Sequence, residues 1–332
     1  MKHTIDLQLQ EMVYELWQSA AFDPDSYRLL EDIAKDLSNL EQFREKLQFK
    51  LSTIRNRNLI TAEQQKVLSE KVIGFFGMSV GSHAALTWGM LSRCNNIKII
   101  DPDTVSPSNL NRLRFGWKDV GREKVKVVEE QLRSMNPSIH VQSYNLSEGI
   151  ETSEIFDGHP ALSCVVDEID DIKEKVVLRQ LAKKRKIPVI SATDVGDNVF
   201  LDIERYDLDP DLELFMGRAR GIESMKLDDL TPMQRMKLIV QIVGLEQNSL
   251  QMLESLISIG KTLPTWPQLG STATMAGGVI ATTLKKILLG ENVQSGRYYI
   301  SLDPVLVSDF NNIESEKKRQ DIISIINNRI KR

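Results

Sequence analysis

The amino-acid sequence predicts an α/β fold with a doubly wound, mostly parallel sheet. Short apolar runs alternate with stretches of helical length through the middle of the chain, and this alternation is typical of parallel strands covered by helices on both faces. A glycine-containing turn follows the first apolar run, and acidic residues follow two later runs. The chain has 332 residues, of which 41% are hydrophobic and 27% charged, so a disordered or collagen-like protein is excluded.

Residues 1–70 are predicted to form a helical N-terminal arm. Apolar side chains recur there at three- and four-residue steps, as in Leu30, Ile33 and Leu37, which places them on one face of a helix. We expect this arm to pack against the rest of the chain or to mediate dimerisation. An alternative is that its basic end, RNRN at 55–58, serves a site.

Residues 71–206 are predicted to form a Rossmann-like core in which strands and helices alternate. The expected strands cover 72–76, 96–100, 163–166, 188–190 and 199–203. The expected helices cover 83–91, 120–135 and 171–185.

Residues 207–262 interrupt this alternation and are predicted to be a helical insertion. An acidic, turn-rich stretch comes first, and two helices over 233–243 and 250–259 follow. Residues 263–332 are expected to return to the core and to end in a terminal helix. The expected elements of this last part are a helix over 270–289, a strand over 298–302 and a helix over 314–330.

The overall charge and the cysteine content limit the function classes. The net charge is −4 and the pI is about 5.8, so no global basic excess indicates a nucleic-acid partner. Two cysteines, Cys94 and Cys164, can form neither a disulfide framework nor a four-cysteine zinc site, and no zinc is expected. The apolar runs are far shorter than the roughly 20 residues that a membrane helix needs. We therefore expect a cytoplasmic protein with no membrane partner.

The first candidate binding element is the turn after the first predicted strand. Gly77, Ser79 and Gly81 form a degraded version of a glycine-rich phosphate turn that leads into a helix N-terminus. Asp101 ends the next predicted strand, where an acidic residue can bind a ribose hydroxyl. The alternative is an ordinary tight strand–helix turn, which also favours small residues.

A polar segment after the second predicted strand is more specific. It contains Asp103, Asn109 and Arg112, and the segment 119–124 that follows ends in Lys124. Arginine offers a bidentate fork and lysine a point charge, which suits a site that binds a triphosphate. The alternative is a solvated charged loop. The position at strand carboxyl ends, where open α/β sheets bind ligands, favours the site.

The third element is the acidic run at the end of the strand over 163–166. Asp167, Asp170 and Asp171 repel one another unless a cation lies among them, and a phosphate-bridging Mg²⁺ would supply that charge. The alternative is helix capping together with the helix dipole, which explains Asp170 and Asp171 without any function.

Together these segments resemble the ubiquitin-activating-enzyme-like adenylyltransferases, the ThiF/MoeB/HesA superfamily. The resemblance covers about 55–193 and 266–302 and rests on the combination SNLNR and VGREK with a strand that ends in DEIDD. The run VDEIDDIKEK is most similar to the branch that includes the tRNA-threonylcarbamoyladenosine dehydratases. The spelling RNRN, GMSVGS, SNLNRLR and WPQL is similar to another bacterial branch.

This resemblance implies that the protein binds ATP and Mg²⁺ and activates a carboxylate as an acyl-adenylate. It implies that Asp101 binds the ribose, that Asn109 and Arg112 contact phosphates, and that Lys124 neutralises charge that builds up during the reaction. Asp170 would hold the Mg²⁺. Positioning and charge neutralisation supply most of the catalysis in such chemistry.

The resemblance also implies a homodimer, in which Arg55 or Arg57 reaches the ATP of the partner subunit. The sequence departs from the family pattern at the glycine turn, where we expect Val80 to crowd a phosphate. It has no paired CxxC motifs and no cysteine in the crossover after Asp194. A covalent thioester relay is therefore not expected, and His83 is assigned a structural role.

We therefore predict ATP-dependent adenylylation of a carboxylate, at the C-terminus of a peptide or small protein, for transfer to an external nucleophile. A first alternative is a tRNA-modifying dehydratase of the threonylcarbamoyladenosine type, the one case that requires a nucleic-acid partner. A second alternative is a catalytically inactive partner subunit or scaffold of the same fold. A nicotinamide-dependent oxidoreductase has no use for the SNLNR segment.

Overall fold

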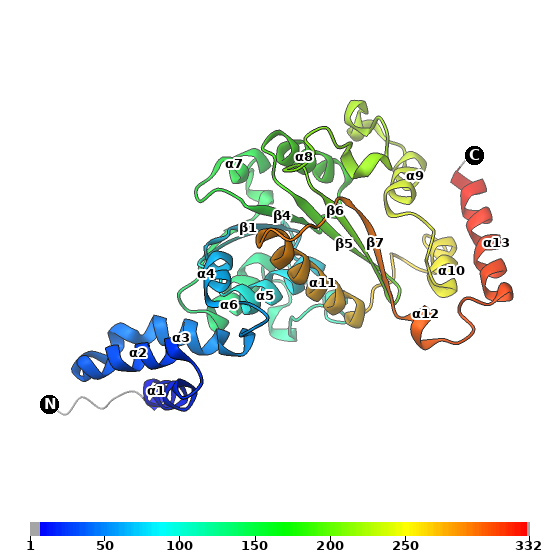
Figure 1. Ribbon diagram of the computed structural model, residues 1–332. Helices are drawn as coiled ribbons and strands as arrows, with labels where there is room; N and C mark the ends of the chain where they lie inside the picture. The colour runs from blue at the N-terminus through cyan, green and yellow to red at the C-terminus, as the bar shows by residue number, and fades with distance from the viewer. Residues whose placement is uncertain (1–6, 331–332) are drawn as a thin grey trace.

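The computed structural model describes residues 7–330 and has a central seven-stranded sheet (Figure 1). The strand order is β3-β2-β1-β4-β5-β6-β7. Strands β1 to β5 are parallel, so the predicted mostly parallel sheet is confirmed. At one edge β6 pairs antiparallel with β5, and β7 pairs antiparallel with β6. The strands are β1 Ile73–Phe76, β2 Asn96–Ile100, β3 His140–Tyr144, β4 Cys164–Asp167, β5 Val189–Val195, β6 Asn198–Glu204 and β7 Gly296–Ser301.

Thirteen α-helices surround this sheet or extend from it within the described residues. They are α1 Leu7–Ala20, α2 Pro24–Lys35, α3 Arg44–Thr53, α4 Ala62–Glu70, α5 Val80–Ser92, α6 Lys124–Met135, α7 Thr152–Asp157, α8 Ile172–Lys184, α9 Pro232–Val243, α10 Leu250–Ser258, α11 Gly270–Leu288, α12 Asp303–Leu306 and α13 Ile313–Ile330.

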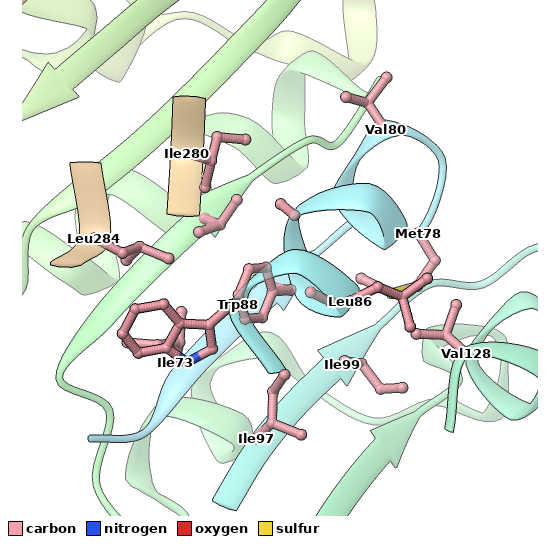
Figure 2. Packing of buried hydrophobic residues seen from close by; sticks show 14 of the residues in the cluster. Ile73, Met78, Val80, Leu86, Trp88, Ile97, Ile99, Val128, Ile280 and Leu284 are labelled. Atoms are coloured by element: carbon pink, nitrogen blue, oxygen red, sulfur yellow. The ribbon is translucent and has the colours of Figure 1, made fainter. Parts of the chain in front are cut away.

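The sheet is buried on both faces because alternate side chains of its central strands enter two different cores. In β1, Ile73 and Phe75 belong to the core beneath α5, α6 and α11, whereas Phe76 belongs to the core beneath α7 and α8. Figure 2 shows the first of these cores, where Trp88 of α5 is fully buried. This two-sided burial explains why the central strands appear in the sequence as continuous apolar runs.

The N-terminal helices α1, α2 and α3 pack around an apolar cluster of their own, which includes Leu16, Ile33 and Leu47. The guanidinium of Arg57 ties this unit to the chain that follows, because Nη1 donates to the carbonyl of Phe22 at 2.9 Å. In Figure 1 these helices lie to one side of the sheet, next to α4.

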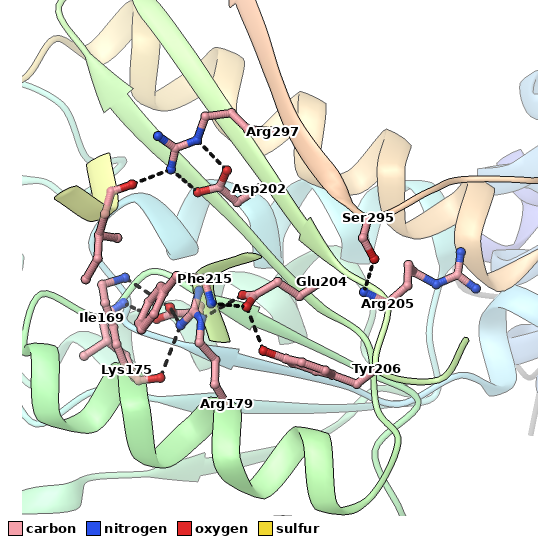
Figure 3. Close-up of polar contacts among 12 residues, drawn as sticks. Ile169, Lys175, Arg179, Asp202, Glu204, Arg205, Tyr206, Phe215, Ser295 and Arg297 are labelled. Carbon is pink, nitrogen blue, oxygen red and sulfur yellow. Dashed lines mark hydrogen bonds and ion pairs between the residues drawn. The ribbon is translucent and has the colours of Figure 1, made fainter. Parts of the chain in front are cut away.

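A buried ionic network joins the region after β6 to the sheet (Figure 3). Arg179 of α8 donates to Asp167 at the end of β4 and to Glu204 at the end of β6, at 2.5 and 2.7 Å. Glu204 also accepts the hydroxyl of Tyr206 and the main-chain N–H of Phe215, both at 2.7 Å. The insertion thus begins with a fully hydrogen-bonded buried carboxylate.

The sequence did not predict β3, α7 or the short helix α12. Only Val141 of β3 is buried, so this edge strand carries no apolar run. The helix expected over 120–135 begins at Lys124, because Gly121 adopts a positive φ of 85° and Glu123 bridges to Thr104. Within residues 7–330, no helix is both long and apolar enough to cross a membrane.

The turn after β1 allows a test of how strongly the fold constrains Gly77. We expect Gly77→Ala to be destabilising, because φ is 92° and a Cβ would lie 2.3 Å from the main-chain oxygen of Glu168. Gly149→Ala is the matched control, since its φ is 82° but nothing lies within 4 Å of its Cβ. Urea unfolding should show a loss for Gly77→Ala about 1–3 kcal/mol larger than for the control. Equal losses in the two variants would contradict the clash.

Candidate nucleotide site

The turn between β1 and α5 contacts the ends of the two neighbouring strands, β2 and β4. Gly77 donates its N–H to the carbonyl of Ile100 in β2, at 2.8 Å, and lies against Glu168, the residue after β4. The next N–H, of Met78, donates to Oδ2 of Asp101 at 2.5 Å. The carboxyl ends of β1, β2 and β4 therefore meet at the point where α5 begins.

The first turn of α5 presents a helix N-terminus at this edge of the sheet. The carbonyl of Ser79 accepts from the N–H and the hydroxyl of Ser82, at 3.2 and 2.7 Å. Gly81 is buried in this first turn. Val80 is only 4% exposed and packs into the apolar core, so its side chain does not project over the turn as we expected. The first N–H groups of a helix have no intrahelical partner and can bind an anion.

Asp101 and Lys124 form a buried charge pair beside the turn. Oδ1 of Asp101 accepts the N–H of Asp103 at 2.7 Å and lies 3.5 Å from Nζ of Lys124. Nζ also donates to Oδ2 of Asp103 at 2.8 Å. Burial raises the pKa of Asp101, and the charge of Lys124 opposes this rise. The ammonium thus lies at the start of α6, between a buried and an exposed carboxylate.

The SNLNR segment, residues 108–112, is an ordered turn rather than a solvated loop. Asn109 is buried, and its Oδ1 accepts the N–H of Ser106 at 3.0 Å. Nη1 of Arg112 donates to the carbonyl of Ser108 and to Oδ1 of Asn111, at 2.9 and 3.0 Å. Nε of Arg112 is buried and has no hydrogen-bond partner among the described residues.

His83 fixes this segment to α5, as its predicted structural role requires. Its Nε2 lies 2.7 Å from the carbonyl of Arg112. Burial lowers the pKa of His83, so the neutral ring, with Nε2 as the donor, is favoured. Helix α11 packs closely against this histidine, because a Cβ on Gly277 would lie 2.7 Å from Cβ of His83.

The acidic run after β4 separates into three roles. Burial disfavours the Asp167 carboxylate, yet Lys175 and Arg179 keep its pKa below the ordinary value, so protein cations supply the charge that we had assigned to Mg²⁺. Asp171 caps α8 by accepting the N–H of Glu174 at 3.0 Å. Asp170 is exposed and has no hydrogen bond or ion pair within residues 7–330. It is therefore the carboxylate of this run that is open to a cation.

Two residues that sequence reasoning did not assign to the site are Asp194 and Gln268. Asp194 is buried near the end of β5, and Nε2 of Gln268 donates to both of its oxygens, at 3.0 and 3.1 Å. Burial raises the pKa of Asp194 to about 6; Gln268 and the charge of Arg112 oppose the rise, and Asp170 adds to it. A polar residue at the carboxyl end of a predicted strand was the available sequence signal.

The structure brings most of the predicted residues together at one edge of the sheet, but not the arginines of the arm. Asn56, between Arg55 and Arg57, donates to the carbonyl of Leu91 at 3.3 Å, and Leu91 lies at the far end of α5. Helix α5 has 13 residues and is therefore about 20 Å long. Both arginines are exposed, but Arg57 is engaged with the N-terminal helices through the carbonyl of Phe22.

Both cysteines are buried. Burial raises the pKa of Cys94 to about 11 and that of Cys164 further still, so neither thiol is poised to react. Among the described residues, no three His, Cys, Asp or Glu side chains are placed to hold a metal ion together. A Mg²⁺ that bridges substrate phosphates needs only one or two protein carboxylates, which an open Asp170 fits.

A sequence profile of the ThiF family matches residues 53–322, which include all seven strands. The chain belongs to this family. The family resemblance that the motifs indicated is thereby confirmed.

Two curated relatives match parts of the chain. The uncharacterized protein MT1398 of Mycobacterium tuberculosis is 31% identical over 252 residues, which make up 76% of this chain and 35% of the relative. The tRNA threonylcarbamoyladenosine dehydratase 1 of Saccharomyces cerevisiae is 28% identical over 165 residues, 49% of this chain and 38% of the relative. The chain thus spans little more than a third of the length of these relatives.

A solved structure supports the fold assignment. The crystal structure of E. coli MccB with ATP has a TM-score of 0.52 at 17% identity, and the match covers 91% of this chain and 86% of that one. The α/β Rossmann-like architecture of the ThiF-family chain is therefore shared with an ATP-bound protein.

The buried carboxyl of Asp194 should make stability depend on pH. Its pKa is raised from 3.8 to about 6, so the folded state binds this proton more tightly, and the contribution of Asp194 to stability falls as pH rises from about 4 to 7. We expect the stability of Asp194→Asn relative to the unsubstituted protein to grow by up to about 3 kcal/mol over that range.

Urea unfolding between pH 4 and pH 7.5 measures this difference. The control is Asp228→Asn, which removes an exposed carboxylate paired with Lys173. Stability curves that stay parallel for Asp194→Asn and the unsubstituted protein would contradict the assignment.

Proposed function

We propose that this ThiF-family protein is an ATP-dependent adenylyltransferase that activates a carboxylate at the C-terminus of a peptide or small protein. The observation that supports it is the convergence of a helix N-terminus, two cations and one open carboxylate at the carboxyl ends of β1, β2 and β4. Arg112 and Lys124 are the cations, and Asp170 is the carboxylate. Open α/β sheets bind ligands at this edge.

In the proposed reaction, an oxygen of the substrate carboxylate attacks the α-phosphorus of ATP. The bond from that phosphorus to the bridging oxygen breaks, and pyrophosphate leaves with its electron pair. The guanidinium of Arg112 has an unpartnered buried Nε, and it would bind phosphate oxygens through its remaining donors. Lys124 would offset the negative charge that builds up, because its ammonium is buried at the start of α6.

Asp170 would hold the Mg²⁺ that accompanies ATP, and the metal would supply further charge neutralisation. Asp101 would contact the ribose at the end of β2, the position where an acidic residue serves this purpose in dinucleotide-binding folds. Asp103 would keep Lys124 oriented, at 2.8 Å from its Nζ. Asn109 would present its amide nitrogen to a phosphate, since its Oδ1 is already occupied by Ser106.

We further propose a homodimer in which Arg55 completes the site of the partner subunit. The segment that carries Arg55 lies at the far end of α5, about 20 Å from the glycine turn of its own subunit. Arg57 contributes less to this proposal, because it is engaged with Phe22 and lies 3.6 Å from Asp23. An arginine supplied across an interface would stabilise charge on the departing pyrophosphate.

The two alternatives receive less support. The yeast relative favours a tRNA dehydratase. However, the basic segment 183–186 lies at the C-terminal end of α8, whereas the N-terminal end of α8 is the one that lies next to the proposed nucleotide site, after β4. An inactive scaffold is opposed by the ordered placement of Arg112 and Lys124. The structure offers no positive reason for either.

ATP–pyrophosphate exchange with a panel of C-terminal peptide carboxylates tests the function, and Asp170→Asn tests the metal assignment. We expect this variant to lose more than about 10²-fold in Mg²⁺-dependent exchange. Asp171→Asn is the matched control, because asparagine also caps helices well. Full exchange by Asp170→Asn would refute the metal role, and the absence of Mg·ATP binding by the unsubstituted protein would refute the function.

Mixing subunits that carry different substitutions tests whether Arg55 completes the site of the partner subunit. We expect Arg55→Ala alone to lose about 10³-fold or more in exchange. Mixing it with Asp170→Ala should restore part of the activity, because one site in each mixed dimer is intact. Arg57→Ala should instead loosen the N-terminal helices, seen as faster proteolysis. An inactive mixture in which mixed dimers demonstrably form would rule out the trans arrangement.

A further inference from the structure

The segment that precedes α11, residues 266–270, joins two parts of the nucleotide site. The side-chain amide of Gln268 donates to both oxygens of Asp194, near the end of β5. The main-chain carbonyl of the same residue accepts Nδ2 of Asn111 at 2.9 Å. One residue therefore spans the distance between a strand end and the SNLNR segment.

The hydrogen bonds continue from Asn111 to Arg112. Oδ1 of Asn111 accepts from Nη1 of Arg112 at 3.0 Å, while its Nδ2 donates to Gln268. The amide of Asn111 is thus used at both ends, which fixes its orientation. An unbroken chain of hydrogen bonds runs from the buried carboxylate of Asp194, through Gln268 and Asn111, to the guanidinium of Arg112.

The surrounding contacts leave this chain little freedom. A Cβ at Gly270 would lie 2.9 Å from the carbonyl oxygen of Asn111, so the start of α11 packs directly against the SNLNR segment. Nε1 of Trp266 donates to the main-chain carbonyl of Asp194 at 3.4 Å. The 266–270 segment is therefore held in place at both ends, by Trp266 and by Gly270. Between these two residues, Gln268 contacts Asp194 through its side chain and Asn111 through its main-chain carbonyl.

We propose that Gln268 is a positioning residue of the nucleotide site, which uses Asp194 as its anchor and orients Arg112 through Asn111. This inference rests on the proposed function, in which Arg112 meets the phosphates. Because Nη1 of Arg112 is occupied by Ser108 and Asn111, the chain determines which guanidinium donors remain for the nucleotide.

Asp194 is suited to be the anchor because it is 5% exposed and its side chain makes no salt bridge within residues 7–330. A hydrogen bond to an ionised acceptor is stronger than one between neutral groups, so the buried carboxylate makes strong hydrogen bonds with the amide of Gln268. Arg112 of the SNLNR segment and Asp170 of the loop after β4 act on the charge of Asp194. The buried Glu168, the residue after β4, is a third charged group here, because Asp194 helps to raise its pKa.

The test measures Mg·ATP affinity of the full chain by calorimetry at pH 8 and at pH 5.5. We expect Gln268→Met, which has a similar size and no amide, to weaken binding at least tenfold at pH 8, where Asp194 is ionised. Gln268→Glu should bind weakly at pH 8, where two carboxylates repel each other, and recover most of the affinity at pH 5.5, where one proton is shared between them. Each value is compared with that of the unsubstituted protein at the same pH.

Thr272→Val is the matched control. It removes a hydrogen bond of 2.6 Å from the start of α11 to the carbonyl of Gly196 but leaves the chain to Arg112 intact, so its affinity should not change. Thermal unfolding of every variant shows whether a loss of affinity reflects a loss of folding. If Gln268→Met does not fold, Gln268→Glu still decides the question, because one protein is compared at two pH values.

Three outcomes overturn the inference. The first is that Gln268→Met folds and binds Mg·ATP as tightly as the unsubstituted protein, while Arg112→Ala binds weakly. The second is that Gln268→Glu shows no recovery at pH 5.5, and the third is that Thr272→Val loses as much affinity as Gln268→Met. If the unsubstituted protein itself does not bind Mg·ATP, the proposed function fails, and the role of Gln268 fails with it.

Discussion

The candidate site depends on the buried carboxylate of Asp101. Its two oxygens accept main-chain N–H groups of Met78 and Asp103, so the segments that follow β1 and β2 donate to the same carboxylate. Lys124 approaches the same carboxylate and thereby places the start of α6. Without this carboxylate, two backbone donors and one ammonium would be left without their buried acceptor, a costly arrangement. The site depends equally on Gly77, because the absence of a Cβ there lets the turn approach the main chain of Glu168, the residue after β4.

A second set of charges is separate from the candidate chemistry. Asp167 ends β4 beside the site, yet Lys175 and Arg179 engage it. The buried guanidinium in turn reaches Glu204, so the acids at the ends of β4 and β6 are bound by one cation. Neighbouring carboxylates of a single acidic run can therefore have different roles. Which role each one has depends on its partners in elements that are distant in the sequence.

Local sequence patterns predicted the fold well where burial is two-sided. Strand β2 was predicted with its observed bounds, because its three isoleucines, interrupted only by Lys98, lie between the polar Asn96 and Asp101. Strand β3 was missed because only Val141 of its five residues is buried. The antiparallel pairing of β6 with β5 and of β7 with β6 could not be predicted from periodicity, which carries no information on strand direction.

The same limit applies to the site. The candidate residues Asp101, Arg112, Lys124 and Asp170 were predicted from short motifs. Asp101 and Asp170 come after strands, Lys124 starts α6, and Arg112 belongs to the SNLNR segment. Gln268 was not predicted, because its role depends on a contact with Asn111, which is 157 positions away in the sequence. The engagement of Asp167 with Arg179 likewise depends on how α8 packs, which the acidic run itself does not reveal.

Glu204 has one further consequence, for the way the protein opens. Its carboxylate is shared by α8, by Tyr206 and by the backbone of Phe215, so it connects the sheet to the insertion. Fraying of the insertion would leave a buried charge without its donors, which opposes partial unfolding. Amide hydrogens of the 204–215 segment and of α8 should therefore exchange with solvent as one cooperative unit, although β5 and β6 separate them in the sequence.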